Sequence, residues 1–245
     1  MRIAVLADIH GNQPALRAVL AEIDLDPADA LVVAGDVVAG PLVRESLELL
    51  AARREPVHWI RGNSEREAVA VYDGAAAGDD PAGRAAAWSA AALDRRWRDE
   101  LASWPITVAV DGVRFCHGSP RSDDEILTVV TPETAFAEAL SDVAEHLVVG
   151  GHTHRQFVRH VREGLTYANA GSIGLPYEGR AGAFWMMLAD GVPQFRETVY
   201  DLEAAVDALR AAGFPEYDDQ LGASLLEPAD PDWASAELER GAGRD

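Results

Sequence analysis

The sequence has a single cysteine, Cys116, among its 245 residues. One thiol excludes a disulfide within the chain and excludes a thiolate cluster that would hold zinc or iron–sulfur. Any metal must therefore be bound through histidine, carboxylate or amide side chains. Cys116 precedes His117 in a strand-like segment, so the two side chains should point to opposite faces, and we interpret Cys116 as a core residue.

Positive charge is also scarce. The 21 Lys and Arg face 41 Asp and Glu, and the formal net charge is -20. Such a field repels DNA, RNA and anionic membranes, so we expect neither long nucleic acid nor a membrane as a partner. A small phosphate ester could still bind if bound cations made the site locally positive.

Two further features are missing. Residues 1–7 are an apolar run that meets Asp8 at once, without the span and cleavage site of a signal peptide, so we expect a cytoplasmic protein. No GxGxxG follows this run, which argues against a nucleotide-dependent oxidoreductase. The content of 48% hydrophobic and 25% charged residues is typical of a folded globular domain.

Apolar runs alternate with amphipathic stretches in the first part of the chain. Residues 3–7, 31–34 and 57–60 resemble buried strands, and residues 14–23 and 41–50 between them have helical spacing. This alternation predicts a parallel sheet.

After residue 106 the pattern changes to short strands joined by Asp-Gly turns. Residues 106–110 with 113–117, and 184–188 with 194–200, predict two hairpins, so we expect a largely antiparallel second half. The other predicted elements are a loop over 73–83 that could cap a site, helices over 84–104, 131–140 and 201–211, and a strand over 147–149.

The chain is expected to contain one domain over residues 1–212. Residues 213–245 are acidic and contain proline, and we expect a tail that is either packed on the domain or partly disordered. The sequence gives no indication of the oligomeric state.

Polar residues that can bind metal follow the predicted strands, which is where open α/β sheets bind ligands. Glycine precedes several of them and allows a tight turn. Imidazole, carboxylate and amide ligands without thiolate suit Mn, Fe, Zn, Co or Ni better than Ca or Mg. In chain order these residues are Asp8, His10, Asp36, Asn63, His117, His152 and His154.

The ordered series D-x-H, GD, GN, H and GHTH resembles the calcineurin-like metallophosphoesterase superfamily, over most of the chain up to about Tyr200. The segments DIHGNQPAL at 8–16 and NAGSIGLP at 169–176 look like its small bacterial branch, related to diadenosine tetraphosphatase, protein-phosphatase-like and phosphodiesterase members. The resemblance implies a mixed α/β fold, a four-layer αββα sandwich of two packed mixed β-sheets, with the metal site at the carboxyl ends of strands.

The resemblance also implies a reaction: in-line attack on a phosphate ester by a hydroxide that bridges two divalent metal ions. Manganese is favoured among Mn, Fe, Zn, Ni and Co. Two such ions against two carboxylates leave a local charge of roughly +2. Asp36, Asn63 and His117 would position the nucleophile. The implied ligands are Asp8, His10 and His154 for one ion, Asn63, His117 and His152 for the other, and Asp36 as the bridge.

Ser64 stands where some members of the family have a histidine that helps the leaving group. A serine hydroxyl is a weak candidate for this role, because it is too weak an acid to deliver a proton easily. We therefore favour a phosphodiesterase. A phosphomonoesterase, a protein-phosphatase-like enzyme and a dinucleoside polyphosphate hydrolase remain alternatives.

Other polar residues near the motifs have two readings. Asn12, Arg61, Arg66 and Ser172 are candidate substrate contacts, although each could instead hold a turn or be a surface charge. The same two readings apply to Arg121, Arg155 and Arg180. We interpret His58, His146 and His160 as structural histidines.

An alternative from another class is a scaffold that kept the fold and lost catalysis, as in the retromer subunit that resembles this family. The complete ligand set argues against it, because none of Asp8, Asp36 and His152 is replaced.

Overall fold

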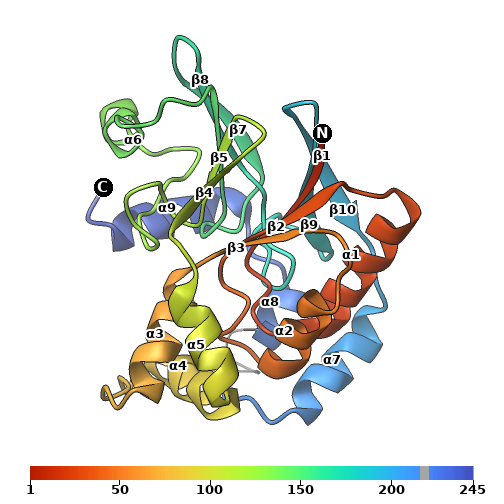
Figure 1. Cartoon of the computed structure of the whole chain (residues 1–245). Coiled ribbons are helices and arrows are strands. Elements are labelled where there is room, and N and C mark those ends of the chain that lie inside the picture. Colours follow the sequence, from red (N-terminus) through yellow and green to blue (C-terminus); the bar gives the residue numbers. More distant parts are fainter. Residues whose placement is uncertain (216–220, 245) are drawn as a thin grey trace.

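The computed structural model describes residues 1–215 and 221–244, which form two five-stranded sheets (Figure 1). The first sheet has the order β10-β9-β1-β2-β3, and the second has the order β4-β5-β6-β8-β7. The strands of the first sheet are β1 (Arg2–Leu6), β2 (Ala30–Ala34), β3 (Val57–Ile60), β9 (Ala183–Ala189) and β10 (Val192–Thr198). Those of the second are β4 (Thr107–Val110), β5 (Val113–Cys116), β6 (Leu147–Gly150), β7 (Phe157–Arg162) and β8 (Leu165–Asn169).

Helices cover the outer faces of both sheets. Figure 1 shows α1, α2 and α7 on the lower right beside the first sheet, and α6 at the upper left beside the second. Within the described residues, no helix is both long and apolar enough to span a bilayer. The helices are α1 (Gln13–Leu25), α2 (Val43–Ala51), α3 (Asn63–Tyr72), α4 (Pro81–Ala92), α5 (Arg95–Ser103), α6 (Glu133–Ala139), α7 (Leu202–Ala211), α8 (Ala223–Leu226) and α9 (Pro231–Gly241).

The two-residue period of β1 shows how the layers are built. Ile3 and Val5 belong to the apolar cluster between the two sheets, together with Phe115 and Val149 of the second sheet. The alternate residues Ala4 and Leu6 belong to the cluster under α1 and α2. A third cluster joins the outer face of the second sheet to α6. This arrangement confirms the predicted four-layer αββα sandwich.

The second sheet is less antiparallel than we predicted. The hairpin β4–β5 is antiparallel as expected, but β6 pairs in parallel with both β5 and β8. The Asp-Gly turns determine only local hairpins. The connection from β5 to β6 passes through α6, which covers the sheet and returns the chain in the same direction.

The single helix predicted over residues 84–104 is wrong, because two helices occupy this segment. Leu93 leaves the helical conformation with ψ 140°, and Asp94 then caps α5 by accepting a hydrogen bond from the backbone N–H of Trp97 at 2.9 Å. The predicted loop over 73–83 is also too long, since α4 begins at Pro81. Its first residue, Asp73, pairs with Arg98 of α5.

The C-terminal segment contains a helix that packs on the rest of the chain. Asp230 caps α9 by accepting from the backbone N–H of Asp232 at 3.0 Å and of Trp233 at 2.9 Å. Further along, the buried Glu239 accepts a hydrogen bond from Thr128 at 2.7 Å. Parts of the predicted tail, residues 216–220 and 245, lie outside the described residues.

Candidate metal centre

The turns that follow β1, β2, β5 and β6 meet where the two sheets face each other. They form two groups of side chains whose potential ligand atoms all lie within 4.8 Å of one another. The first group is Asp8, His10 and His154, and the second is Asp36, His117 and His152. Six of the seven predicted ligands therefore converge as the sequence suggested.

These turns hold non-glycine residues in an unusual backbone conformation. Five predicted ligands have positive φ, a region that L-residues other than Asn and Asp seldom adopt. Backbone strain of this kind concentrates at functional sites and persists only where the surroundings enforce it. The residues and angles are Asp8 (54°), His10 (47°), Asp36 (53°), His152 (67°) and His154 (58°).

The first group is almost completely removed from solvent. Nε2 of His154 lies 3.1 Å from Nε2 of His10 and 3.1 Å from Oδ1 of Asp8. Asp8 is fully buried, and its other carboxylate oxygen accepts a hydrogen bond from the backbone N–H of His152 at 2.9 Å. This bond links the turn after β1 to the turn after β6.

The second group has the same geometry. Nε2 of His117 lies 3.2 Å from Nδ1 of His152 and 3.3 Å from Oδ1 of Asp36. The same Asp36 oxygen accepts a hydrogen bond from the backbone N–H of Ser64 at 3.0 Å. Asp36 also lies near the first group, since its Oδ2 is 3.9 Å from Nε2 of His10. A carboxylate between the two groups is well placed to bridge two cations.

Backbone carbonyls determine which ring nitrogen carries hydrogen in two of the histidines. Nδ1 of His117 donates to the carbonyl of Ala34 at 2.7 Å, and Nδ1 of His154 donates to the carbonyl of Leu175 at 2.7 Å. In the neutral ring, Nε2 then presents its lone pair to the site. This is the arrangement by which proteins orient histidine ligands of metals.

Two candidate ligand oxygens have no hydrogen-bond donor. Oδ1 of Asp8 and Oδ1 of Asn63 are buried and make no hydrogen bond within the described residues. Buried polar groups are normally satisfied, so unpaired atoms at one place indicate a missing partner. Asn63 neighbours Ser64, which binds Asp36, so its free oxygen belongs to the same region.

The electrostatics of the site favour positive charge at His117. Burial lowers the pKa of His117, but the negative charges of Asp36 and Asp8 outweigh burial and raise it to about 10. A cation between the two carboxylates would meet the same demand. Converging lone pairs, orphaned oxygens and this field together show that the residues present fit divalent metal ions.

Glycine is needed at position 62 for a different reason from the tight turn that we predicted. Its φ is −90°, so it needs no glycine-specific conformation. A Cβ atom at this position would instead lie 2.1 Å from Oδ1 of Asp36. Glycine is required because the candidate bridging carboxylate packs directly against the backbone.

Glu65, which we did not predict as a site residue, organises the turn after β2. Its carboxylate is fully buried and accepts hydrogen bonds from the backbone N–H groups of Asp36 at 2.9 Å, Val37 at 2.8 Å and Gly62 at 2.7 Å. Glu65 thereby holds the turns that carry Asp36 and Asn63. Its position in the first turn of the helix after Asn63 was the available signal, since acidic residues there often bind free backbone N–H groups.

Asn12 and Ser172, which we predicted as candidate substrate contacts, make structural hydrogen bonds. Asn12 is fully buried and caps α1, because its Oδ1 accepts from the backbone N–H of Ala15 at 3.2 Å. The hydroxyl of Ser172, also fully buried, donates to the carbonyl of Asp8 at 2.7 Å and accepts from the N–H of Leu175 at 2.9 Å. Ser172 thus connects two segments that hold metal-site residues.

The arginines near the motifs form ion pairs with carboxylates of the protein. Nε of Arg61 and Nε of Arg66 both lie 3.1 Å from the carboxylate of Asp123, which is 6% exposed. Arg121 pairs with Glu125, Arg155 with Asp232 and Arg180 with Glu197.

The remaining predictions are simpler. Cys116 is fully buried in the cluster under α6, which confirms it as a core residue. Within the described residues, His58, His146 and His160 belong to neither ligand group.

A family model described as the calcineurin-like phosphoesterase superfamily domain matches residues 1–190. The chain belongs to this superfamily. Over 76 residues it is also 36% identical to a symmetrical bis(5'-nucleosyl)-tetraphosphatase from Yersinia enterocolitica. That alignment covers 30% of this chain and 26% of the Yersinia protein, so the match spans about a quarter of the relative's length.

Two solved structures share the fold over nearly their whole length. A metallophosphoesterase from Sphaerobacter thermophilus superposes with a TM-score of 0.76 at 24% identity, covering 93% of this chain and 98% of that one. A hypothetical protein from Pyrococcus horikoshii OT3 gives a TM-score of 0.78 at 20% identity, covering 94% and 99%.

Proposed function

We propose that the protein is a hydrolase that cleaves a small phosphate ester with two divalent metal ions. The observation that carries the proposal is the convergence of two groups of histidine and aspartate ligands, joined by Asp36, at the seam between the sheets. Family membership supports the same reaction class. One ion would be held by Asp8, His10 and His154, the other by Asn63, His117 and His152, with Asp36 shared between them.

The residues of the chain prepare this site before any substrate binds. Two bound cations would supply positive charge for the phosphate oxygens and would lower the pKa of the attacking water. The protein's own contribution is orientation: the N–H groups of His152 and Ser64 fix the two carboxylates, and backbone carbonyls fix His117 and His154. Ordered ligands of this kind need little reorganisation during reaction.

We favour a phosphodiester as the substrate and manganese as the metal. Ser64 is 6% exposed and has no side-chain nitrogen that could protonate a poor leaving group. Diesters with good leaving groups need this proton less than alkyl monoesters do. Histidine and carboxylate ligands are compatible with manganese among other transition metals.

A dinucleoside polyphosphate is the second candidate substrate. Its support is the similarity of 76 residues to a protein named as a bis(5'-nucleosyl)-tetraphosphatase. An anhydride also has a good leaving group, so it is compatible with Ser64 as well.

The test is hydrolysis of bis-p-nitrophenyl phosphate, p-nitrophenyl phosphate and diadenosine tetraphosphate by the manganese-loaded protein. We expect preferential cleavage of the diester, and a loss of more than about 100-fold in Asp36→Ala, since even outer-shell changes at metal sites cost about 10–100-fold. If the protein instead cleaves the monoester or the tetraphosphate preferentially, that compound replaces the diester as the proposed substrate class. Metal binding without turnover of any of the three would favour a catalytically silent scaffold.

A further inference from the structure

A cavity of about 310 Å³ lies beside the candidate metal centre. One wall is formed by Leu175 and Tyr177, in the segment that follows Ser172. The helix α9 also lines the cavity, through Trp233, Ala234 and Glu237. The cavity therefore lies between a segment in contact with the metal ligands and the C-terminal helix.

The first wall touches a metal ligand directly. The ring of Tyr177 lies against the ring of His154, with 4.9 Å between their centroids. The backbone N–H of Tyr177 donates to the carbonyl of His154 at 3.0 Å, and the carbonyl of Leu175 accepts from Nδ1 of His154 at 2.7 Å. The ring of Tyr177 would then be the only side chain between a group bound against its other face and His154 of the first ligand group.

The second wall is fastened to the same turn. Arg155 follows His154, and its guanidinium donates to the carbonyl of Pro231 at 3.0 Å, to Asp232 at 2.9 Å and to Ser235 at 3.0 Å. These bonds fix the start of α9 relative to the metal ligands. Both walls are therefore positioned by the segment that carries His154.

Trp233 differs from the other tryptophans of the chain in its exposure to solvent. All six tryptophans lie in the part of the chain that the structure describes, and five of them are buried or half-buried. Trp233 alone is exposed, at 59%. It lines the same cavity as Tyr177. Large exposed aromatic surface beside a concave site commonly marks a place where a ligand stacks.

The charge of the cavity limits what can bind. Glu237 is the only charged side chain among the described residues that line it, and no arginine or lysine is present there. Glu237 pairs with Arg240, which does not line this cavity, so a polyphosphate or a second phosphate would meet no cation among the lining residues. The lining suits an uncharged planar group.

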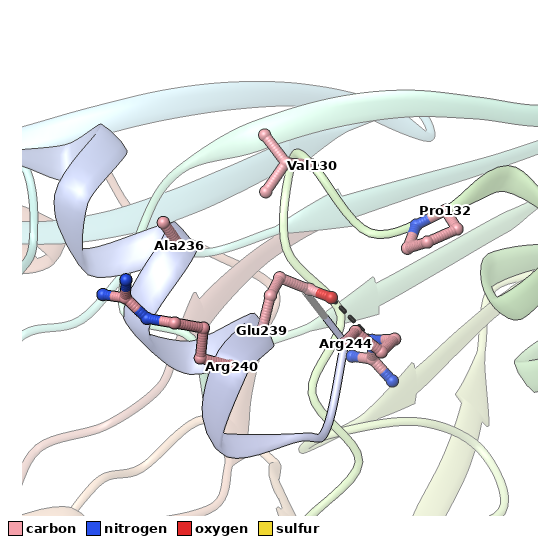
Figure 2. Close-up of a pocket in the computed structure, with 6 residues that line it drawn as sticks. All are labelled: Val130, Pro132, Ala236, Glu239, Arg240 and Arg244. Atoms are coloured by element: carbon pink, nitrogen blue, oxygen red, sulfur yellow. Dashed lines mark hydrogen bonds and ion pairs between the residues drawn. The ribbon is translucent and has the colours of Figure 1, made fainter.

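A larger cavity of about 520 Å³, formed by α9 and the loop around Val130, is a weaker candidate (Figure 2). Its charged residues already have partners: Arg244 lies 2.6 Å from Glu239, as the dashed line in Figure 2 marks, and Arg240 pairs with Glu237. None of the six residues that line it is itself a predicted metal ligand. Among the described residues, nothing therefore connects this larger cavity to the candidate metal centre.

We propose that the cavity between Tyr177 and Trp233 binds an uncharged planar ring of the substrate, the class that includes nucleobases and aryl groups, while the phosphate lies at the metal centre. The inference rests on the proposed function and narrows its substrate class. Trp233 and Tyr177 act as binding residues, and Arg155 is a positioning residue.

The test measures binding to the manganese-loaded full chain by calorimetry, with adenosine 5'-monophosphate, phenyl phosphate and methyl phosphate as probes. The three share a phosphate monoester and differ in the attached group. We expect at least one ring-bearing probe to bind about tenfold more tightly than methyl phosphate, in the range that stacking on one aromatic side chain provides. The tighter of the two ring-bearing probes identifies a nucleobase or an aryl group as the preferred ring.

Trp233→Ala should remove this tenfold advantage and leave the affinity for methyl phosphate unchanged. Trp233→Phe retains a ring and should keep most of the advantage. Phe195→Ala is the matched control, because Phe195 is an exposed aromatic residue (42%) on β10, outside the cavity. Trp233 is largely exposed, so its removal is not expected to unfold the protein, and circular dichroism checks this.

The inference is overturned if both ring-bearing probes bind no more tightly than methyl phosphate, or if Trp233→Ala leaves their advantage intact. Failure of the proposed function looks different, because bis-p-nitrophenyl phosphate would then not be hydrolysed. Adenosine, which has no phosphate, separates the two cases: its binding to the wild type and not to Trp233→Ala would support the cavity even without turnover.

Discussion

The two sheets of the molecule contribute different chemistry to the candidate metal centre. The first sheet, through the turns after β1, β2 and β3, supplies both carboxylates, the amide and one histidine. The second, through the turns after β5 and β6, supplies three histidines. Neither sheet provides a complete ligand group, because each group draws residues from both. Bound metal would therefore join the two sheets as well as support catalysis.

Loss of one ligand from either sheet should have the largest effect. We expect Asp36→Ala in the first sheet and His152→Ala in the second each to lower kcat/KM for the best ester by more than about 100-fold. His160→Ala is the control, since His160 is an exposed histidine on β7 of the second sheet, outside both groups. A loss confined to variants of one sheet would show that the other sheet's residues do not share the site.

Removal of metal should lower the free energy of unfolding, because the ligands of each ion come from both sheets. Binding at about 100 times the dissociation constant contributes about 2.7 kcal/mol for each site. For a chain of this size, the loss of about 5.4 kcal/mol from two sites should lower the melting temperature by about 10–20 °C on chelation. Calorimetry with and without chelator measures the shift, and readdition of manganese should reverse it. An unchanged melting temperature would contradict a metal link between the sheets.

Glu65→Gln should destabilise the first sheet's side of the centre. Both carboxylate oxygens of Glu65 accept hydrogen bonds from backbone N–H groups. In glutamine an NH2 group replaces one of these oxygens, and because it cannot accept a hydrogen bond, the N–H groups that it faces are left unpaired. Buried N–H groups left unpaired cost about 1–3 kcal/mol each, so we expect the free energy of unfolding to fall by about 3 kcal/mol. Glu67→Gln, on the same helix and half-buried, is the control for chemical denaturation.

Ser172→Ala should have the smallest effect. Its hydroxyl joins the carbonyl of Asp8 to the N–H of Leu175, which spans from the first sheet to the segment that orients His154. We expect a loss of about 1 kcal/mol in stability and about tenfold weaker metal binding. Metal titration of the wild type and the variant measures this, and an unchanged affinity would limit Ser172 to a turn.

The first sheet was the easier part to predict from sequence. Its parallel strands are largely apolar runs, and Asp8, Asp36 and Asn63 follow them by two or three residues. Position alone was a weak signal for each ligand in either sheet, and the ordered series of the family identified the set. The parallel core of that sheet could not be read, because hairpin turns record only contacts between neighbours along the chain.

Other features depend on contacts between distant segments. The role of Glu65 depends on the folded turn after β2, which lies 27 to 29 positions earlier in the chain. The cavity residues Tyr177 and Trp233 are far apart in the sequence, and Arg155 helps to place the second by donating to the carbonyl of Pro231 at the start of α9. The helix α9 itself had a local signal, since Asp230-Pro231 is a favourable helix start, but acidic composition obscured it.

The most direct test of the central claim is the metal content of the purified chain, measured by elemental analysis after reconstitution with manganese and removal of free metal. We predict about two ions per wild-type chain and fewer in Asp36→Ala, because the shared carboxylate belongs to both sites. A folded wild-type chain that retains no metal would contradict the account.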